Sequence, residues 1–195
     1  MVVVSLEIEA GFTGLSRSRG PGAVGLMQDF LNTIDIESET DLVGTPPALS
    51  EWLAAKGLVA GGTQLSRAEH RRVVELRERL RDALEASTHG ASPADAYAHL
   101  DEIAADVPLR VRFGEAAHLE PAHRRSAPAV GPILATVYDA LGDEVLSRLK
   151  VCRNDACRWA FYDTSRNRSG VWCSMAICGN RQKGRVFRRR HAGDR

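Results

Sequence analysis

The chain has 195 residues, 44% of them hydrophobic, and a formal net charge of +1. This length allows one large domain, or one ordinary domain with a small module, and the composition supports a packed core. The sequence contains no apolar run of about eighteen residues that would span a bilayer. Its first residues lack the basic and long apolar regions of a signal peptide, so a cytoplasmic protein without a membrane partner is expected.

The small net charge hides a strong asymmetry along the chain. From Arg148 onward there are thirteen Lys or Arg against three acids, whereas the first 147 residues carry thirteen basic and twenty-two acidic groups. Clustered cations release counterions from phosphate backbones, so the C-terminal part is expected to bind a polyanion. The alternatives are a solvated tail and a tail folded back on its own acidic domain.

The N-terminal segment has Gly and Ser at short intervals. Residues 1–24 are therefore expected to form a flexible leader. Gly20, Gly22 and Gly25 fit the spacing of a dinucleotide-binding turn. No apolar strand precedes them and a Pro lies within the turn, which favours a linker. The following residues, 26–36, are apolar but too few for periodicity to distinguish a strand from a helical turn.

Two helices are expected next. Residues 48–56 form the first, which buries Trp52 and ends at Gly57. Ser66 and Glu69 have the spacing of a capping box, which starts the second and clearest helix of the chain. The apolar residues of this helix recur at intervals of three and four: Val73, Leu76, Leu80, Ala83 and Leu84. The residues expected to face solvent are Arg71, Arg72, Glu75, Arg77, Glu78 and Arg79.

A third helix and a small hairpin follow. Pro93 suits the first turn of a helix that runs to about Ala105. Its expected inward residues are Tyr97, Leu100 and Ile103. Residues 107–113 then alternate with period two, and a turn at Gly114 leads to a return strand over residues 117–119.

Residues 130–141 form the last helix of this part. Its expected inward residues are Ile133, Leu134, Val137 and Leu141. Gly142 ends the helix, and Asp143 caps a short segment that runs to Leu149. The predicted fold class is therefore mainly α with a small β-hairpin (α+β), in a mainly helical domain over residues 25–147.

Enzymatic motifs are missing from the sequence. There is no His-Glu-x-x-His, no Gly-x-Ser-x-Gly and no phosphate-binding loop of the Walker type. The six histidines are scattered along the chain. No catalytic residue is assigned, and a protein that is not an enzyme is expected.

All four cysteines lie in the cationic C-terminal part. They are Cys152, Cys157, Cys173 and Cys178. They form two pairs, each with four residues between its cysteines, and fifteen residues separate the pairs, a spacing typical of a tetrahedral structural zinc site. A reducing cytoplasm favours metal binding over two disulfides. We expect one zinc ion per chain, which supplies folding free energy to residues 148–195. A redox-labile thiol switch or another metal are the alternatives.

The residues between the cysteine pairs predict a β-hairpin. Its strands would lie over residues 158–162 and 171–172, with the tip at residues 165–170. Asp163 is expected to anchor this hairpin, or Arg181, by hydrogen bonds. A helix is expected from Cys178 to about Arg190. Cysteine turn, hairpin, second turn and helix together predict a treble-clef-like zinc module.

The basic residues of this module suit nucleic acid. Arg181, Arg185 and Arg188 fall on one side of the expected helix, which can enter the major groove of DNA, where Arg bridges guanine O6 and N7. Arg166 and Arg168 at the hairpin tip suit phosphates. The predicted nucleic-acid-binding residues are Arg166, Arg168, Arg181, Lys183, Arg185, Arg188, Arg189 and Arg190.

Several short sequences resemble a known family. Cys178-Gly179-Asn180-Arg181 resembles the signature of the CGNR zinc-finger family, and residues 161–167 and 172–175 resemble the same family. Val171 stands where the family has a basic residue, and Gly184 where it has a better helix former. Upstream, residues 29–33, 51–53 and 57–58 resemble the ABATE domain of stress-induced transcription regulators. The resemblance implies a role in transcription regulation.

These observations predict a DNA-binding transcription regulator. The four-cysteine zinc module and its basic helix would bind DNA, and the N-terminal domain would serve sensing, dimerisation or contact with a partner. An RNA-binding protein is the first alternative, since the same cations serve and exposed aromatic residues stack on unpaired bases. A zinc-thiol redox sensor and a protein-docking adaptor are the others. The sequence identifies no small-molecule ligand of the N-terminal domain.

Overall fold

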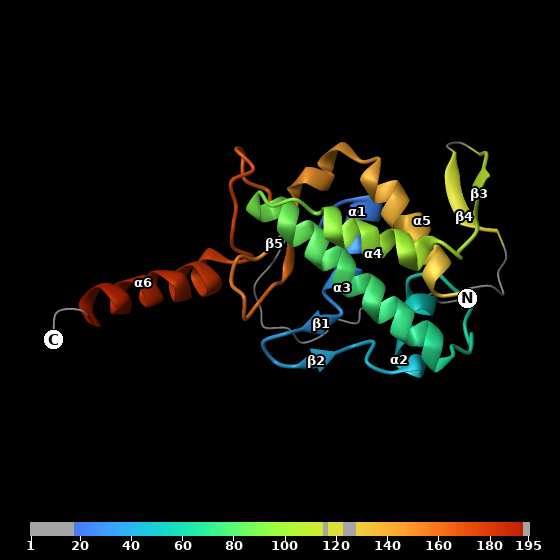
Figure 1. Cartoon of the computed structure of the whole chain (residues 1–195), viewed down its shortest axis with the longest axis horizontal. Helices are drawn as coiled ribbons and strands as arrows, with labels where there is room; N and C mark the ends of the chain where they lie inside the picture. Colours follow the sequence, from blue (N-terminus) through green and yellow to red (C-terminus); the bar gives the residue numbers. More distant parts are fainter. Residues whose placement is uncertain (1–17, 115–116, 123–127, 193–195) are drawn as a thin grey trace, which may run out of the picture.

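Helices form the body of the protein and short antiparallel strand pairs lie at its edges (Figure 1). The structure, a computed structural model, describes residues 18–114, 117–122 and 128–192. The helices are α1 (Gly22–Leu31), α2 (Pro46–Ala55), α3 (Arg67–His89), α4 (Ala94–Ala104), α5 (Val130–Leu141) and α6 (Asn180–Ala192). The strand pairs are β1 (Ile34–Asp35) with β2 (Thr40–Asp41), β3 (Leu109–Arg112) with β4 (His118–Pro121), and β5 (Leu149–Val151) with β6 (Ala160–Tyr162). The predicted fold class is confirmed.

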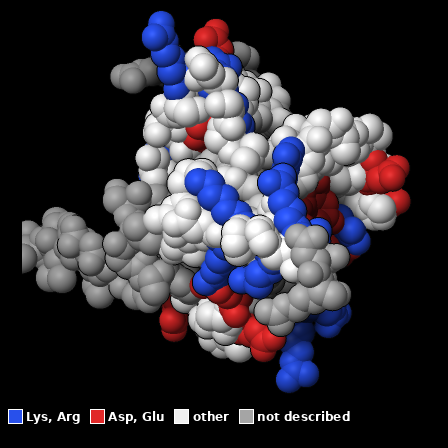
Figure 2. Space-filling model, turned by 90° about the vertical axis from the view of Figure 1, so that its left-hand side faces the viewer, with Lys and Arg blue, Asp and Glu red and all other residues white. Residues whose placement is uncertain are grey.

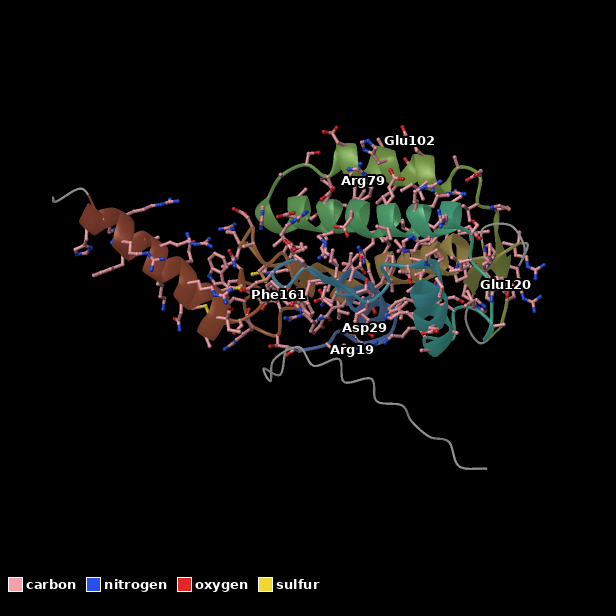
Figure 3. All side chains as sticks on the ribbon, turned by 90° about the horizontal axis from the view of Figure 1, so that it is seen from below. Arg19, Asp29, Arg79, Glu102, Glu120 and Phe161 are labelled. Carbon is pink, nitrogen blue, oxygen red and sulfur yellow. The ribbon has the colours of Figure 1, made fainter. Side chains whose placement is uncertain are left out.

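The long helix α3 is the centre of the body. Its capping box is formed as predicted, since Ser66 Oγ accepts from the Glu69 amide at 3.1 Å and the Glu69 carboxylate accepts from the Ser66 amide. The apolar stripe of α3 is buried between α4 on one side and α1 and α5 on the other (Figures 1 and 3). One prediction for α3 is wrong. Arg77 does not face solvent but is buried, because Asp41 of β2 accepts two hydrogen bonds of 2.8 Å from its guanidinium.

Two other expected core residues are exposed. Tyr97 of α4 is 47% exposed and Leu141 of α5 is 60% exposed. Both helices have the expected bounds to within a residue or two, and Ile103 and Ile133 are buried as predicted. α4 packs mainly against α3, and Leu141 is the last residue of α5, so other elements leave these two side chains largely uncovered.

The N-terminal helix begins earlier than the sequence predicted. α1 starts at Gly22, within the expected leader, and it includes the first part of the apolar run 26–36, whereas β1 takes the second part. The preceding residues are attached to it: the Gly20 amide donates to Gln28 Oε1 at 2.9 Å, and Arg19 pairs with Asp29 at 3.0 Å (Figure 3). Residues 1–17 of the expected leader lie outside the described residues.

The hairpin predicted between the cysteine pairs has a different partner strand. β6 pairs with the preceding β5, in the register Leu149 to Tyr162, and not with residues 171–172. Leu149 and Ala160 are buried in the same core as the helices, and β5 packs against α3. Pairing with β5 is favoured because it buries apolar side chains in the core in addition to forming backbone hydrogen bonds. The first cysteine turn, which joins β5 to β6, is therefore attached directly to the helical core.

The helix α6 differs from the others because it projects from the body (Figure 1). It continues from a π-helical turn, η2 (Met175–Gly179). A 3₁₀ turn, η1 (Glu144–Arg148), links α5 to β5, and the Asp143 carboxylate caps it by accepting from the Val145 amide. Among the helices of the described residues, none has the length and apolar character needed to cross a membrane.

Candidate zinc site and nucleic-acid interface

The structure brings the four predicted ligands together. The sulfur atoms of the four cysteines all lie within 4.8 Å of one another. Cys157 Sγ lies 3.6 Å from Cys173 Sγ, and Cys173 Sγ lies 3.8 Å from Cys178 Sγ. Zinc bound tetrahedrally to sulfur at about 2.3 Å requires sulfur atoms roughly 3.8 Å apart. The geometry therefore fits one zinc ion held by four thiolates.

The four thiols are close enough to influence one another's ionisation. Hydrogen bonds from Cys157 and Cys173 lower the pKa of the Cys152 thiol to about 2, while the hydrogen bond to Cys152 raises the pKa of Cys157 to about 12. The pKa of Cys173 is raised for the same reason. One thiolate thus suppresses ionisation of its neighbours, because adjacent negative charges repel. A bound divalent cation removes this penalty, and zinc supplies folding free energy when all four ligands are thiolates.

Each cysteine pair sits on a turn that the backbone defines. In the first, the Cys152 amide donates to Trp159 O at 2.9 Å and the Cys157 amide donates to Asn154 O at 2.7 Å. In the second, Ser174 caps η2 by accepting from the Ile177 amide at 3.3 Å, which places Cys178 at the base of α6. In Figure 3 the sulfur atoms lie where α6 meets the body. The site therefore joins α6 to the β5–β6 hairpin.

Asn154 is a further residue of the site that the sequence did not reveal. Its side chain is buried, and Nδ2 lies 3.6 Å from Cys178 Sγ as a donor. Its Oδ1 accepts from Arg185 at 3.2 Å. Hydrogen bonds of this kind, made to the ligating atoms, orient metal ligands. In the sequence, only the position of Asn154 between Cys152 and Cys157 could have indicated that it belongs to the site.

The loop at residues 163–170 is held by Asp163, as expected. This buried carboxylate accepts from the amides of Ser165 and Gly170, at 2.9 and 2.8 Å, and from Lys150 Nζ at 2.7 Å. Burial opposes its ionisation, but the hydrogen bonds from Lys150 and the amides outweigh this effect and lower the pKa of Asp163 well below its usual range. Asp163 is bonded to the loop and not to Arg181. The loop carries Arg166 and Arg168, both exposed.

A polar network docks this module on the helical body. The Asn32 side chain donates to Ala160 O at 2.8 Å and accepts from the Ala160 amide at 2.9 Å. Arg81 is fully buried and donates to Arg158 O at 2.8 Å and to Leu31 O. The guanidinium of Arg158 pairs with Asp82 and Glu85 of α3. Sequence reasoning missed these residues, because their partners lie on distant segments.

The predicted nucleic-acid-binding residues fall into two groups. In the first group Arg181 pairs with Glu37 of the β1–β2 turn at 2.6 Å, and Arg185 donates to Asn154. Arg168 also belongs to this group, since it donates to Ser147 Oγ at 2.8 Å, so all three are tied to the protein itself. The pKa of Arg181 is raised by the hydrogen bond to Glu37. The second group has exposed side chains and no hydrogen-bond or ion-pair partner within the described residues: Arg166, Lys183, Arg188, Arg189 and Arg190.

The α6 end of the protein is therefore cationic. Figure 2, which views this end, shows Lys and Arg side chains across the near surface, together with some Asp and Glu. α6 contains six Lys or Arg and no acid. The electrostatic potential of such a helix attracts anions, and phosphate contacts from its arginines would add to the affinity for nucleic acid.

Comparison with known proteins agrees with both parts of the chain. The sequence profile of the CGNR zinc finger matches residues 148–191. The ABATE profile, described as "Putative stress-induced transcription regulator", matches residues 25–144. No curated protein matches the chain. Because the ABATE profile covers more than half of the 195 residues, the chain belongs to the ABATE family and carries a CGNR zinc finger after the ABATE domain.

Proposed function

We propose that the protein is a DNA-binding transcription regulator in which the zinc finger presents α6 to duplex DNA. The observation that carries the proposal is the free cationic end of α6, with Arg188, Arg189 and Arg190 exposed on a helix that projects from the body. An α-helix fits the major groove of DNA, where arginine can donate hydrogen bonds to guanine O6 and N7. The description of the ABATE family supports a regulatory role in the response to stress.

The zinc ion has a structural part in this proposal. It fixes Cys178 at the base of α6 to the β5–β6 hairpin, which in turn is packed into the helical core. The helix is therefore held in a constant orientation toward the body. The ABATE domain would supply dimerisation, sensing or contact with a partner. We propose no catalytic role for the chain.

Binding should be measured with the full zinc-loaded chain. Fluorescence anisotropy with labelled duplex DNA over a salt series gives the affinity and the slope of log K against log salt concentration. The variant Arg188→Ala/Arg189→Ala should weaken binding and reduce the slope by about 2, since each lost phosphate contact contributes about 0.9. Zinc content should stay at one ion per chain.

A matched control removes the same charge elsewhere. Arg67 and Arg71 are exposed residues of α3, far from α6 in the fold. Arg67→Ala/Arg71→Ala should leave the slope nearly unchanged. Equal losses in both variants would refute the interface, because they would indicate attraction by overall charge alone. Competition with structured RNA separates the alternatives, and tighter binding to RNA than to duplex DNA would favour an RNA-binding protein.

A further inference from the structure

A second surface of α6 has the character of a protein-docking groove. An open groove of about 420 Å³ lies along α6 and η2. Its apolar lining comes from Trp172, Met175, Val186 and Phe187. Met175 of η2 is 56% exposed and Phe187 of α6 is 63% exposed. Contact of such large apolar side chains with water is unfavourable.

The groove faces away from the contacts that hold α6. At 100° per residue, Lys183, Val186 and Arg190 share one side of the helix, whereas Arg181 and Arg185 fall on the opposite side. These two arginines form the contacts with Glu37 and Asn154 that tie α6 to the body. Met175, Val186 and Phe187 are exposed, and the ring of His191 stacks on Phe187 at 4.1 Å.

The charges at the groove decide between the candidate occupants. Its charged lining residues are Lys183 and Arg190, and α6 has no acid. A second copy of α6 would place its six Lys and Arg side chains next to the six of the first copy, at distances shorter than the Debye length of about 8 Å. Repulsion between these charges disfavours self-pairing. Duplex DNA would satisfy the cations but leave the apolar lining in contact with water.

We propose that this groove binds an acidic amphipathic helix of another protein. Apolar residues of the partner at intervals of three and four would fill the groove between Met175, Val186 and Phe187, and its Asp and Glu residues would face Lys183 and Arg190. This is the helix-in-groove mode of recognition, in which apolar anchors supply affinity and charges supply orientation. The docking surface is distinct from the DNA-binding surface but borders it. Arg188 lies on the other side of α6 and Arg189 on its flank, whereas Arg190 lines the groove and belongs to both surfaces.

The test uses a designed peptide as the probe. It is a fluorescein-labelled amphipathic helix of Leu and Glu, about five turns long, with Leu at positions i, i+3, i+4 and i+7. A scrambled peptide of the same composition keeps the charge but loses the apolar face. Anisotropy with the zinc-loaded full chain should show at least tenfold tighter binding of the amphipathic peptide than of the scrambled one.

Paired variants locate the binding surface. Met175→Ala/Phe187→Ala should weaken binding of the amphipathic peptide about tenfold or more, since truncation of central apolar anchors commonly has effects of this size. Both side chains are exposed, so zinc content and unfolding temperature should not change. The control is Phe113→Ala, which removes an even more exposed aromatic residue, 88% accessible, near the β3–β4 hairpin. This control should bind the peptide normally.

Several results would overturn the proposal. Equal binding of the scrambled peptide would mean attraction by charge alone, and unchanged affinity of Met175→Ala/Phe187→Ala would place the peptide elsewhere. A dimer of the wild-type chain that dissociates in this variant would assign the groove to a second copy. Binding of single-stranded oligouridylate, but not of peptide, with the same dependence on Phe187 would assign the groove to base stacking.

Discussion

Removal of zinc should destabilise the helical body as well as the finger. The perturbation is a chelator added to the purified chain. The expectation rests on the β5–β6 hairpin, which carries the first cysteine turn and is also part of the main core through Leu149 and Ala160. If the finger loses its order without metal, the contacts of this hairpin with α1 and α3 are lost too.

The size of the effect follows from those contacts. Leu149 is buried, and its exposure would cost about 2 kcal/mol. Four hydrogen bonds are lost with it: two between Asn32 and Ala160, one from Arg81 to Arg158 O, and one from the Val151 amide to Thr88 Oγ1. At about 1 kcal/mol each they bring the total to about 6 kcal/mol. Domains have a free energy of unfolding of about 5–15 kcal/mol in all. At about 2–4 °C per kcal/mol for a chain of this length, the body should melt roughly 12–24 °C lower.

The assay needs a signal from the body alone. The chain has three Trp, of which Trp159 and Trp172 pack at the zinc site, whereas Trp52 packs on Phe30 in the body with ring centroids 5.8 Å apart. In the variant Trp159→Phe/Trp172→Phe, fluorescence reports Trp52. Its thermal midpoint should fall on addition of chelator and recover with excess zinc. If zinc leaves and the Trp52 midpoint stays within about 2 °C, the coupling is refuted.

The other predictions concern single side chains. Asp163→Asn should destabilise the folded chain by about 3 kcal/mol at neutral pH, since Lys150 loses its buried partner. The folded pKa of Asp163 is depressed, so its contribution is present above pH ~4 and is lost as the pH falls toward the folded pKa; urea unfolding of wild type and variant should converge in acid, and a constant difference would contradict this. Arg81→Met should cost about 2–3 kcal/mol in urea unfolding because the carbonyls of Leu31 and Arg158 lose their donor; a stability equal to wild type would show that the apolar replacement compensates. Glu37→Gln should tighten DNA binding at low salt by freeing Arg181, with Glu39→Gln as the charge-matched control; equal gains in both variants would mean that only net charge matters.

Local patterns predicted much of the fold. The capping box and the spacing of apolar residues located α3, the period of the apolar residues gave the bounds of α5, and the cysteine spacing identified the zinc ligands. These features depend on residues close together in the sequence or on a ligand chemistry that few residues share.

The missed features depend on partners far away in the sequence. The β6 strand could pair with β5 or with residues 171–172, and only the burial of Leu149 and Ala160 in the core selects β5. Arg77 lies among alternating charges that suggest an exposed helix face, but Asp41 lies opposite in the fold and stabilises it when buried. The same holds for Arg181, whose assignment to nucleic acid did not foresee Glu37.

The burial of Ala160 limits how this finger can be reused. A fragment beginning near residue 148, where the family profile begins, would contain all four cysteines. It would also expose Leu149, leave the Ala160 amide without Asn32, and leave Arg158 without the carboxylates of α3. Fusing this finger to an unrelated protein would thus carry over the metal site but not the surface that holds it. A fusion that keeps this finger docked would therefore need a matching α1–α3 face.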